Sequence, residues 1–361
     1  MGTRAVLIAL GVLSLLTGIV WGAGIPVTGC REITAPGTYS LQNDILDSDA
    51  VACINISSPH VVFLGNGHTI DGQDLPGSQG IINTRWLASD VVVQDVTVAD
   101  WEFGIHLYQT KNSSIRGSTA MSSRTGIIPG HTNSTIADCQ VITSHYGIWA
   151  WTHTNFTITN TTIRENLYHG LYLGFSENCT VEHNRIEGNT GFGSFFTNLK
   201  NTRISDNYFN NTENVLIKTN VAGNQWNTTL RQGKNIAGGP FLAGNFWANP
   251  SGTGFSQTCE DSNGDSICDA AYVLDAENTD YLPLSRVIPR SLPGYSSPPT
   301  DPDGDGIYED LNGNDRLDFA DVVLYFNQIT WIAANEPIAA FDLNHNNRID
   351  FADIVALFNE I

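Results

Sequence analysis

The feature that most constrains this chain is an internal repeat. Between Ser89 and Lys218 the sequence repeats six times with a period of 21 to 23 residues. Periods of about 20 to 50 residues are typical of stacked structural units. Two apolar or small columns, five residues apart, recur in every unit, and we expect both to face the interior: Val93, Ile115, Ile136, Ile158, Val181 and Ile204, then Val98, Ala120, Val141, Ile163, Ile186 and Phe209.

Each repeat also carries signs of short strands. Eleven or twelve residues after the first column comes a glycine in five of the six units, followed by alternation such as Ile148-Trp149-Ala150-Trp151. This pattern predicts a half-buried strand after a tight turn. Three short strands in about 22 residues, with no helical period, predict a mainly β fold, a parallel β-helix with coils about 4.8 Å apart. A leucine-rich horseshoe has the same period, but no leucine ladder or helical segment recurs.

A third column consists mostly of small or amide side chains. It lies three residues after the first column, where inward side chains can hydrogen-bond along the stack, so we interpret its asparagines as structural. Its members are Val96, Ser118, Cys139, Thr161, Asn184 and Asn207.

Charge is distributed unevenly along the chain. The formal net charge is -20, and from Cys259 onward 20 acids stand against 4 arginines, a net -16 that leaves -4 for everything before. Nucleic acid is therefore not expected as a partner. So local an excess of carboxylates suggests groups that hold cations.

The N-terminus has the pattern of an export signal. Arg4 precedes an uninterrupted apolar run from Ala5 to Val20 and then small residues, which predicts a secretory signal peptide over residues 1–24. An uncleaved membrane anchor is the alternative, because the run is close to the ~17-residue lower limit for spanning a bilayer. Eight N-x-S/T sequons are consistent with an extracellular or cell-surface glycoprotein: Asn55, Asn112, Asn133, Asn155, Asn160, Asn178, Asn210 and Asn227.

Six cysteines in an exported chain favour disulfides. We expect Cys30 to pair with Cys53, and Cys259 with Cys268. Cys139 and Cys179 lie in different columns two coils apart, roughly 10 Å at the stacking interval. That separation is beyond disulfide reach, so two buried free thiols are predicted.

Several phrases resemble a known family. They are PGTYSLQNDI, VVFLGNGHTIDG, the 22-residue repeats and GNFWANPSGTGFSQTCEDSNGDSICD followed by TDYLPL. They are similar to NosD-type right-handed parallel β-helix (pectin-lyase-like) proteins, especially secreted archaeal surface proteins, over about Cys30 to Leu284. The resemblance implies the fold for residues 25–285, whereas lyases, hydrolases, epimerases and inert surface proteins all use it. The family name also implies copper-site maturation, but two methionines and nine scattered histidines argue against copper delivery.

A separate module follows a segment rich in proline and serine. Residues 286–300 read RVIPRSLPGYSSPPT, which predicts a flexible linker. In residues 301–361, DLNGNDRLDFADVVLYFNQI from Asp310 matches DLNHNNRIDFADIVALFNEI from Asp342 at 13 of 20 positions. Each copy places oxygen side chains at positions 1, 3, 5, 9 and 12 of a loop, the order in which a calcium loop wraps its ion. The predicted Ca²⁺ ligands are Asp310, Asn312, Asn314, Asp318 and Asp321, then Asp342, Asn344, Asn346, Asp350 and Asp353.

Each loop precedes an amphipathic helix. The two helices are expected to bury their apolar faces against each other: Val322, Val323, Tyr325 and Phe326 against Ile354, Val355, Leu357 and Phe358. This pair of repeats resembles a dockerin type I domain, which implies docking to a cohesin-like protein. Positions 10 and 11, usually polar in cohesin binders, are Phe319-Ala320 and Phe351-Ala352, and this departure weakens the cohesin expectation.

Two further loops have calcium-like spacing. One contains Asp301, Asp303 and Asp305, and the other contains Asp261, Asn263, Asp265 and Asp269 between two cysteines. Asx-turns that need no metal are the alternative for both loops.

A row of outward aromatic residues is the candidate ligand-binding surface. Exposed aromatics in a row are unusual on a soluble protein, and they suit sugar rings, which stack on aromatic faces through apolar C–H patches. The predicted ligand-binding residues are His106, Tyr108, Trp149, Trp151 and Tyr172.

Ionisable residues border this row and would be the catalytic groups of an enzyme. In that hypothesis His145, Tyr168 or His169 takes a proton, Arg124 neutralises a uronate carboxylate and Glu102 assists. Hydrolysis would need two carboxylates about 5 Å or 6.5–9.5 Å apart. The nearest outward pair, Asp95 and Asp138, is expected roughly 10 Å apart. In the alternative, Glu102 and Arg124 form an exposed ion pair and the aromatics bind glycan or protein without chemistry. We favour a binding protein, with a polysaccharide lyase or glycoside hydrolase as the second hypothesis.

Overall fold

The computed structural model describes residues 24–361 except 85–87, 288, 304–305 and 347. The predicted signal peptide lies outside the described residues apart from Gly24. None of the helices in the described part has the length and apolar character needed to cross a membrane.

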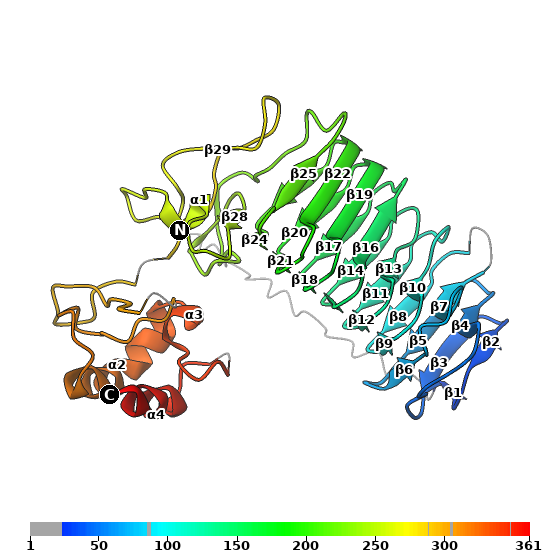
Figure 1. Cartoon of the computed structure of the whole chain (residues 1–361), viewed down its shortest axis with the longest axis horizontal. Coiled ribbons are helices and arrows are strands. Elements are labelled where there is room, and N and C mark those ends of the chain that lie inside the picture. Colours follow the sequence, from blue (N-terminus) through cyan, green and yellow to red (C-terminus); the bar gives the residue numbers. More distant parts are fainter. Residues whose placement is uncertain (1–23, 85–87, 288, 304–305, 347) are drawn as a thin grey trace, which may run out of the picture.

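Three parallel sheets wind into a solenoid, a β-helix of the right-handed type (Figure 1). The first sheet contains β1 (Ile25–Val27), β3 (Gly37–Leu41), β5 (Val61–Leu64), β8 (Val92–Gln94), β11 (Ser114–Arg116), β14 (Thr135–Ala137), β17 (Thr157–Thr159), β20 (Thr180–Glu182) and β23 (Arg203–Ser205). The second contains β2 (Arg31–Ile33), β4 (Ala52–Ile56), β7 (Gln79–Asn83), β10 (Phe103–His106), β13 (Thr125–Ile128), β16 (Tyr146–Trp151), β19 (His169–Glu177), β22 (Phe192–Lys200) and β25 (Val215–Ile217).

The third sheet closes each coil. It contains β6 (Thr69–Asp71), β9 (Thr97–Ala99), β12 (Thr119–Met121), β15 (Gln140–Ile142), β18 (Thr162–Arg164), β21 (Arg185–Glu187), β24 (Tyr208–Asn210) and β28 (Phe246–Ala248). Beyond the solenoid lie short antiparallel pairs and helices: β26 (Arg231–Gln232) with β27 (Phe241–Leu242), β29 (Tyr272–Val273) with β30 (Thr279–Asp280), α1 (Phe255–Thr258), α2 (Phe319–Asn335), α3 (Ile338–Phe341) and α4 (Phe351–Glu360).

The predicted register is confirmed. Ile115 pairs with Val93 on one side and Ile136 on the other, and the second column pairs in the same way. All twelve members of the two columns are buried in one continuous core. Their burial supplies the main stabilisation of the solenoid, because it removes their apolar surface from water.

The repeated glycines have a different cause from the tight turn that we expected. Those at positions 104, 126, 147, 170 and 193 do not have a positive φ angle. A Cβ atom on Gly147 would instead lie 2.4 Å from the carbonyl oxygen of Gly170 in the next coil. Glycine is therefore required by the close approach of stacked backbones.

Left-handed backbone occurs at the corners, mostly on Asx residues. Asp95, Gly117, Asp138 and Asn160 follow one another in successive coils, each with φ between 48° and 57°. Asn and Asp tolerate this region better than other side chains, and glycine is free of the Cβ penalty. The predicted outward pair Asp95 and Asp138 therefore occupies a corner column.

The small-polar column forms a buried hydrogen-bonded ladder, as expected. The Asn184 side-chain amide donates to Asn207 Oδ1 at 2.9 Å, and the Asn207 amide donates to Asn245 Oδ1 at 2.9 Å. A second ladder, which the sequence interpretation missed, runs through Asn166, Asn189 and Asn211. These amides satisfy backbone carbonyls at bends, where strand pairing stops.

The cysteines have the expected pairing, with two disulfides and two free thiols. The structure joins Cys30 to Cys53 and Cys259 to Cys268, and it leaves Cys139 and Cys179 as buried free thiols. Burial raises the pKa of both free thiols to about 11.

A buried carboxylate closes the C-terminal end of the solenoid. Asp280 accepts hydrogen bonds from the backbone N–H of Asn245 at 2.8 Å and from the indole N–H of Trp247 at 2.9 Å. Burial raises its pKa from 3.8 to about 6. The protonated form is thus favoured more in the folded chain than in the unfolded chain.

Asp280 should therefore make stability depend on pH. Its contribution is fully present below pH 3.8 and is lost as the pH rises through about 6, by about 3 kcal/mol in total. We expect the wild type to lose this much unfolding free energy relative to Asp280→Asn between pH 4 and pH 7, as measured by urea unfolding of both proteins. A stability difference between the two that stays constant across this range would contradict the assignment.

The C-terminal module has its own core beside the C-terminal end of the solenoid (Figure 1). Asp318 and Asp350 cap the N-termini of α2 and α4. Within the predicted linker, Leu292 is buried in the core of this module, and Gln328 of α2 donates to the carbonyl of Pro293. This part of the segment is thus packed against the module.

The prediction that both helix faces are fully buried is wrong. Val322, Tyr325, Ile354 and Leu357 are buried, but the rest of the predicted face is exposed: Val323, Phe326, Val355 and Phe358. Leu343 and Phe341 fill the other side of the core, so each helix keeps a second apolar strip that points outward.

Candidate functional site

Aromatic residues form a stack across three neighbouring strands of the second sheet. Trp149 of β16 pairs in register with Tyr172 of β19, which pairs with Phe195 of β22. The rings of Trp149 and Tyr172 are 4.3 Å apart at 6°, and those of Tyr172 and Phe195 are 4.9 Å apart at 14°. Because parallel in-register strands place equivalent side chains at the strand spacing, the rings stack along the solenoid axis.

The stack changes which rings are available to a ligand. Tyr172 is only 8% exposed because its neighbours cover both of its faces. Trp149 and Trp151 remain half-buried. Phe175, which the sequence interpretation missed, is 47% exposed and lies 4.5 Å from Trp151. We define Trp149, Trp151 and Phe175 as the aromatic strip.

Phe175 is held in an unfavourable backbone conformation. Its φ is 52°, and a bulky side chain in the left-handed region is a backbone outlier. Thr152 and Asn198, at the same place in the adjacent coils, have φ of 63° and 51°. The neighbouring coils therefore hold the bend, and Phe175 is the bulky member of this column. Such strain is concentrated at functional sites.

His106 and Tyr108 lie further along the same sheet. His106 pairs with Ile128 of the next coil, and Trp149 occupies the same position one coil further on. His106 and Trp149 are therefore two coils apart. His106 Nδ1 is 2.8 Å from Gln79 Oε1, and burial lowers the pKa of His106 to about 4, so the ring is neutral at physiological pH. Tyr108 is exposed and its ring centroid is 6.3 Å from that of His106.

Three of the predicted catalytic residues line one cavity. Glu102, Arg124 and His145 border a hollow of about 530 Å³ together with Asp74, Pro76, Ser122, Ser123, Thr143 and Leu167. Arg124 Nη1 is 2.6 Å from Glu102 Oε1. Glu102 also accepts the backbone N–H of Gly77, and this bond and then Arg124 lower its pKa. Glu102 is thus a carboxylate already bound to the cation that a uronate would need.

The other two predicted catalytic residues do not line this cavity. Tyr168 is exposed and stacks on Tyr146 at 5.3 Å. His169 packs against Phe192 and Phe195, and burial lowers its pKa. Its Nδ1 is buried without a hydrogen-bond partner. The cavity therefore collects three of the five side chains, while the ring of Tyr168 lies 5.2 Å from that of His145 and 6.4 Å from that of His169.

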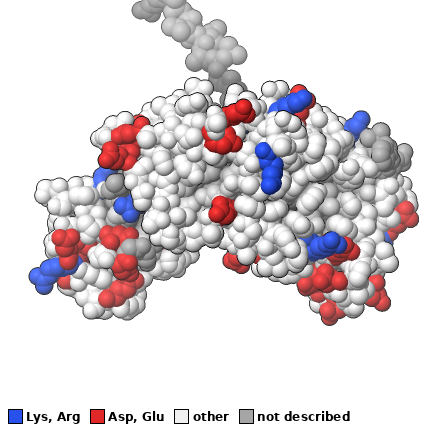
Figure 2. Space-filling view, turned by 45° about the horizontal axis from the view of Figure 1, so that its top comes forward, with Lys and Arg blue, Asp and Glu red and all other residues white. Residues whose placement is uncertain are grey.

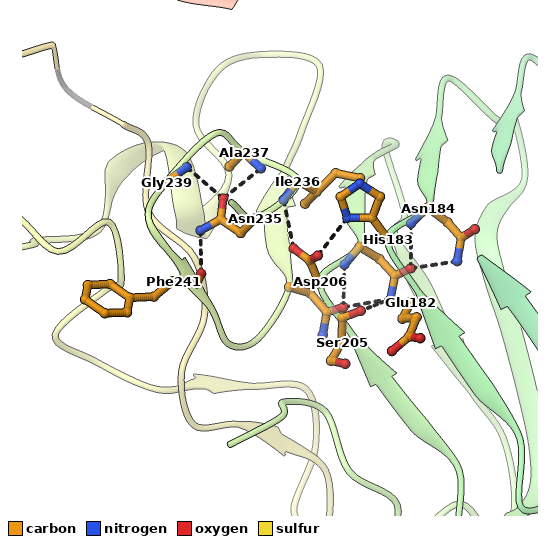
Figure 3. Close-up of polar contacts among 12 residues, drawn as sticks. Glu182, His183, Asn184, Ser205, Asp206, Asn235, Ile236, Ala237, Gly239 and Phe241 are labelled. Atoms are coloured by element: carbon orange, nitrogen blue, oxygen red, sulfur yellow. Dashed lines mark hydrogen bonds and ion pairs between the residues drawn. The ribbon is translucent and has the colours of Figure 1, made fainter. Parts of the chain in front are cut away.

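A second cavity of about 530 Å³ lies between the solenoid and the C-terminal module. His183, Arg185 and Lys234 line one side, and Pro337, Ile338 and Asp342 line the other. Figure 3 shows how the loop that carries Asn235 and Ile236 is attached: Asp206 accepts from Ile236 N–H at 2.8 Å and contacts His183 Nδ1 at 2.8 Å.

The cations of this second cavity are largely engaged. The hydrogen bond to Asp206 raises the pKa of His183. Arg185 pairs with Glu187 at 3.0 Å and lies over the ring of Tyr208. Through Asp206, the bonds to Ile236 and His183 join the loop to the coils, and Lys234 is the third cation in the lining.

The two predicted calcium loops fold in the same way. Asp321 accepts from the side-chain amide of Asn312 at 2.7 Å and from the backbone of Asp318 at 2.9 Å. Asp353 accepts in the same way from the side-chain amide of Asn344 at 2.8 Å and from the backbone N–H of Asp350 at 2.7 Å. Both carboxylates are fully buried, and desolvation raises their pKa values. Position 1 of each loop, Asp310 or Asp342, is buried as well.

The loop before them has a candidate ligand that the sequence interpretation missed, whereas its predicted ligand Asp305 lies outside the described residues. Asp301 and Asp303 have carboxylate oxygens within 4.8 Å of each other and of Glu309. Glu309 is position 9 of a loop that starts at Asp301, a spacing that could have revealed it. In contrast, Asp261 accepts the backbone N–H groups of Gly264 and Ser266 and the hydroxyl of Ser285, as an Asx-turn does.

Comparison with solved structures reveals distant likeness in fold. A Dettilon tailspike protein is 12% identical over 51% of this chain and 42% of its own length, with a TM-score of 0.43. Pectate lyase Pel9A is 11% identical over 56% of this chain and 68% of its own, with a TM-score of 0.42. The Azotobacter vinelandii mannuronan C-5 epimerase AlgE4 A-module is 15% identical over 50% of this chain and 62% of its own, with a TM-score of 0.28. The chain thus spans less than half of the tailspike protein.

Sequence comparison identifies a family. No curated protein matches the chain. A family model described as "Periplasmic copper-binding protein (NosD)" matches residues 43–252, which is more than half of the 361 residues and covers most coils of the solenoid. The chain therefore belongs to the NosD family.

Proposed function

We propose that this protein is an exported, extracellular or cell-surface glycan-binding protein whose aromatic strip contacts sugar rings. The observation that carries the proposal is the partly exposed group of Trp149, Trp151 and Phe175, in which both tryptophan rings stack on Tyr172 of the next coil. Sugars present apolar C–H faces, and flat aromatic rings held rigidly lose little entropy on binding them. A strand-based platform keeps the rings at a fixed spacing, which suits a repeating polysaccharide.

The charge distribution is compatible with this role. Figure 2 shows a face on which acidic side chains gather at the C-terminal module and at the N-terminal coils, with scattered charges of both signs on the solenoid between them. The residues before Cys259 have a net charge of only -4, and this near balance favours recognition by stacking and hydrogen bonds over ion pairing. Neutral or weakly acidic polysaccharides are therefore the ligands we expect.

A polysaccharide lyase or glycoside hydrolase is the second candidate, favoured by the cavity that Glu102, Arg124 and His145 line. Against it, the Glu102–Arg124 ion pair already neutralises the cation, and Glu102 lacks the raised pKa of a general acid. An exposed pair of this kind contributes at most about 1 kcal/mol to stability. We therefore rank binding above catalysis.

We further propose that residues 301–361 are a dockerin-like, calcium-binding domain. Buried carboxylates with matching partners in both repeats, and the group Asp301, Asp303 and Glu309, fit a hard, oxygen-preferring cation. Calcium there would offset carboxylate repulsion and order the loops. The loop at Asp261 is a weaker candidate, because backbone N–H groups and Ser285 already occupy its carboxylate.

Copper, which the family description names, does not suit the donor groups of the described residues. Their one compact group of three ionisable ligands is made of carboxylates. His183 is paired with the carboxylate of Asp206 and His68 with that of Asp44, and burial keeps the thiols of Cys139 and Cys179 protonated. Soft or nitrogen ligands are what copper prefers, so no copper chemistry is proposed.

The proposal is tested by incubating the full chain with polygalacturonate, alginate and a neutral glucan. We expect saturable binding to at least one polymer, measured by affinity electrophoresis, and no new unsaturated or reducing ends. Turnover that disappears in Arg124→Ala or His145→Ala would establish the enzyme hypothesis instead. Absence of both binding and turnover would contradict the proposal that this protein recognises a carbohydrate.

A further inference from the structure

The outward strips of α2 and α4 form one apolar groove. It has a volume of about 340 Å³, and its walls carry no polar side chain. Eight residues line it: Phe319, Val322, Val323, Phe326, Phe351, Ile354, Val355 and Phe358. Four phenylalanines on one exposed surface are unusual for a soluble domain, because apolar patches of this kind mark interaction sites.

The groove has an internal two-fold relationship. Phe319 contacts Phe358 with ring centroids 6.3 Å apart at 77°, and Phe326 contacts Phe351 at 6.3 Å and 81°. Each contact joins position 10 of one repeat to position 17 of the other. The surface therefore presents nearly the same shape after a half turn, as a consequence of the sequence duplication.

Charge is almost absent from these two helices. Besides Asp321 and Asp353, which are fully buried in the loops, Glu360 is the one acidic or basic side chain in α2 and α4. Ala320, Ala352 and the two asparagines at positions 327 and 359 occupy further surface positions. A partner that covers the groove would thus desolvate no charged group at its centre, and such desolvation is the usual penalty at an interface.

The exposed area is large enough for a stable interface between two copies. The four phenylalanines are 55–61% exposed, and Val323 and Val355 are 43% and 45% exposed. With about 200 Å² per aromatic side chain, each copy offers about 600 Å² of apolar surface. Two copies would bury about 1,200 Å², which is within the range of specific interfaces.

We propose that this groove binds the same groove of a second copy of the chain, so that α2 and α4 of both copies form a four-helix bundle. A two-fold contact brings the same patch of both copies together, and the internal two-fold lets each half of this patch meet an equivalent half of the second copy. Packing of two helix pairs buries the phenylalanines as the core positions of a bundle. The inference names the partner of the dockerin-like domain and rests on its fold, independently of glycan binding by the solenoid.

The net charge of the module opposes this association, so the dimer should depend on salt in a characteristic way. From Asp301 onward 13 acids and 2 arginines give each module a net charge of -11. Two such modules repel each other, and salt screens the repulsion within about 10 Å at 0.1 M. We therefore expect the dimer to strengthen with added salt and with calcium, whereas a basic partner would be released by salt.

Sedimentation velocity of the full chain in calcium buffer tests the proposal. We expect the wild type to change from monomer to dimer over the micromolar range. The double variant Phe326→Ser with Phe358→Ser should weaken association at least about tenfold, because truncation of central aromatic residues removes the interface hot spot. Tyr281→Ser, at a residue that is 70% exposed on a distant loop, is the matched control and should leave the dimer unchanged.

A second pair of changes covers the case in which the serine variant unfolds. Val323→Lys with Val355→Lys places like charges at exposed edges of the groove, and thermal melts in the same buffer check that the module is folded. A folded wild type that stays monomeric, or a dimer that survives both variants, would overturn the proposal. Loss of glycan binding alone would affect only the role assigned to the solenoid.

Discussion

Replacing Asn207 by alanine is expected to lower the unfolding free energy of the solenoid by about 3–5 kcal/mol. Its side-chain amide donates to the carbonyls of Val181 and Ser205 and to Asn245. Its Oδ1 accepts both the backbone and side-chain N–H groups of Asn184. The side chain is fully buried, so alanine leaves several polar groups without water or a partner. Chemical denaturation monitored by circular dichroism measures the loss.

An exposed asparagine provides the matched control for this change. Asn43 donates to neighbouring carbonyls at the surface, where water replaces any bond that is lost. Asn43→Ala should therefore change stability by no more than about 0.5 kcal/mol. If Asn207→Ala and Asn43→Ala were equally mild, the ladder would not stabilise the bends.

Removing calcium is expected to have the second large effect, confined to the C-terminal module. Asp310, Asp321, Asp342 and Asp353 are buried carboxylates, and in two of them desolvation raises the pKa, so their charges are costly without a cation. A ligand at 1,000 times its dissociation constant stabilises the folded form by about 4 kcal/mol. For a module of this size that corresponds to a melting temperature about 15–30 °C higher.

Calorimetry with calcium, with magnesium and with chelator measures this effect. Calcium should move the transition of the module and leave that of the solenoid in place, while magnesium, which demands a stricter octahedral site, should move it less. Coincident melting curves in calcium and in chelator would contradict the calcium assignment. The proposed dimer would still be tested independently by sedimentation velocity.

The predictable part of the fold is the part that repeats. Val93 and its equivalents revealed the coil period, and the column logic also placed Cys139 and Cys179 apart as free thiols. Periodicity indicates which side chains face inward, because equivalent positions in stacked coils have the same surroundings. The second ladder of Asn166, Asn189 and Asn211 follows the same rule and could have been found by aligning the residues before the glycines.

The candidate site was predictable in its location but not in its accessibility. Sequence placed Tyr172 on the outward face, yet only the structure shows that the rings on either side cover it. Phe175 was missed because the in-out alternation of the strand breaks after Gly174, at Phe175 itself, where the backbone is left-handed. In the tail, two-fold duplication predicted the loops, but helical periodicity could not decide which of two apolar strips faces the core.

A two-subunit arrangement would give the glycan surface a further property. Two aromatic strips on one dimer could engage two sites on the same polymer, and such linkage raises apparent affinity without new contacts. The dimer-disrupting variant should therefore bind immobilised polysaccharide less tightly than the wild type, while its affinity for a short oligosaccharide stays the same.

The most direct test of the central claim is the binding isotherm of the Trp149→Ala, Trp151→Ala double variant on the polysaccharide that the wild type binds. With Tyr281→Ala as the exposed aromatic control and melting temperature as the check on folding, we expect affinity to fall at least about tenfold for the double variant alone. An unchanged isotherm in a folded double variant would contradict the assignment of the aromatic strip as the glycan-binding surface.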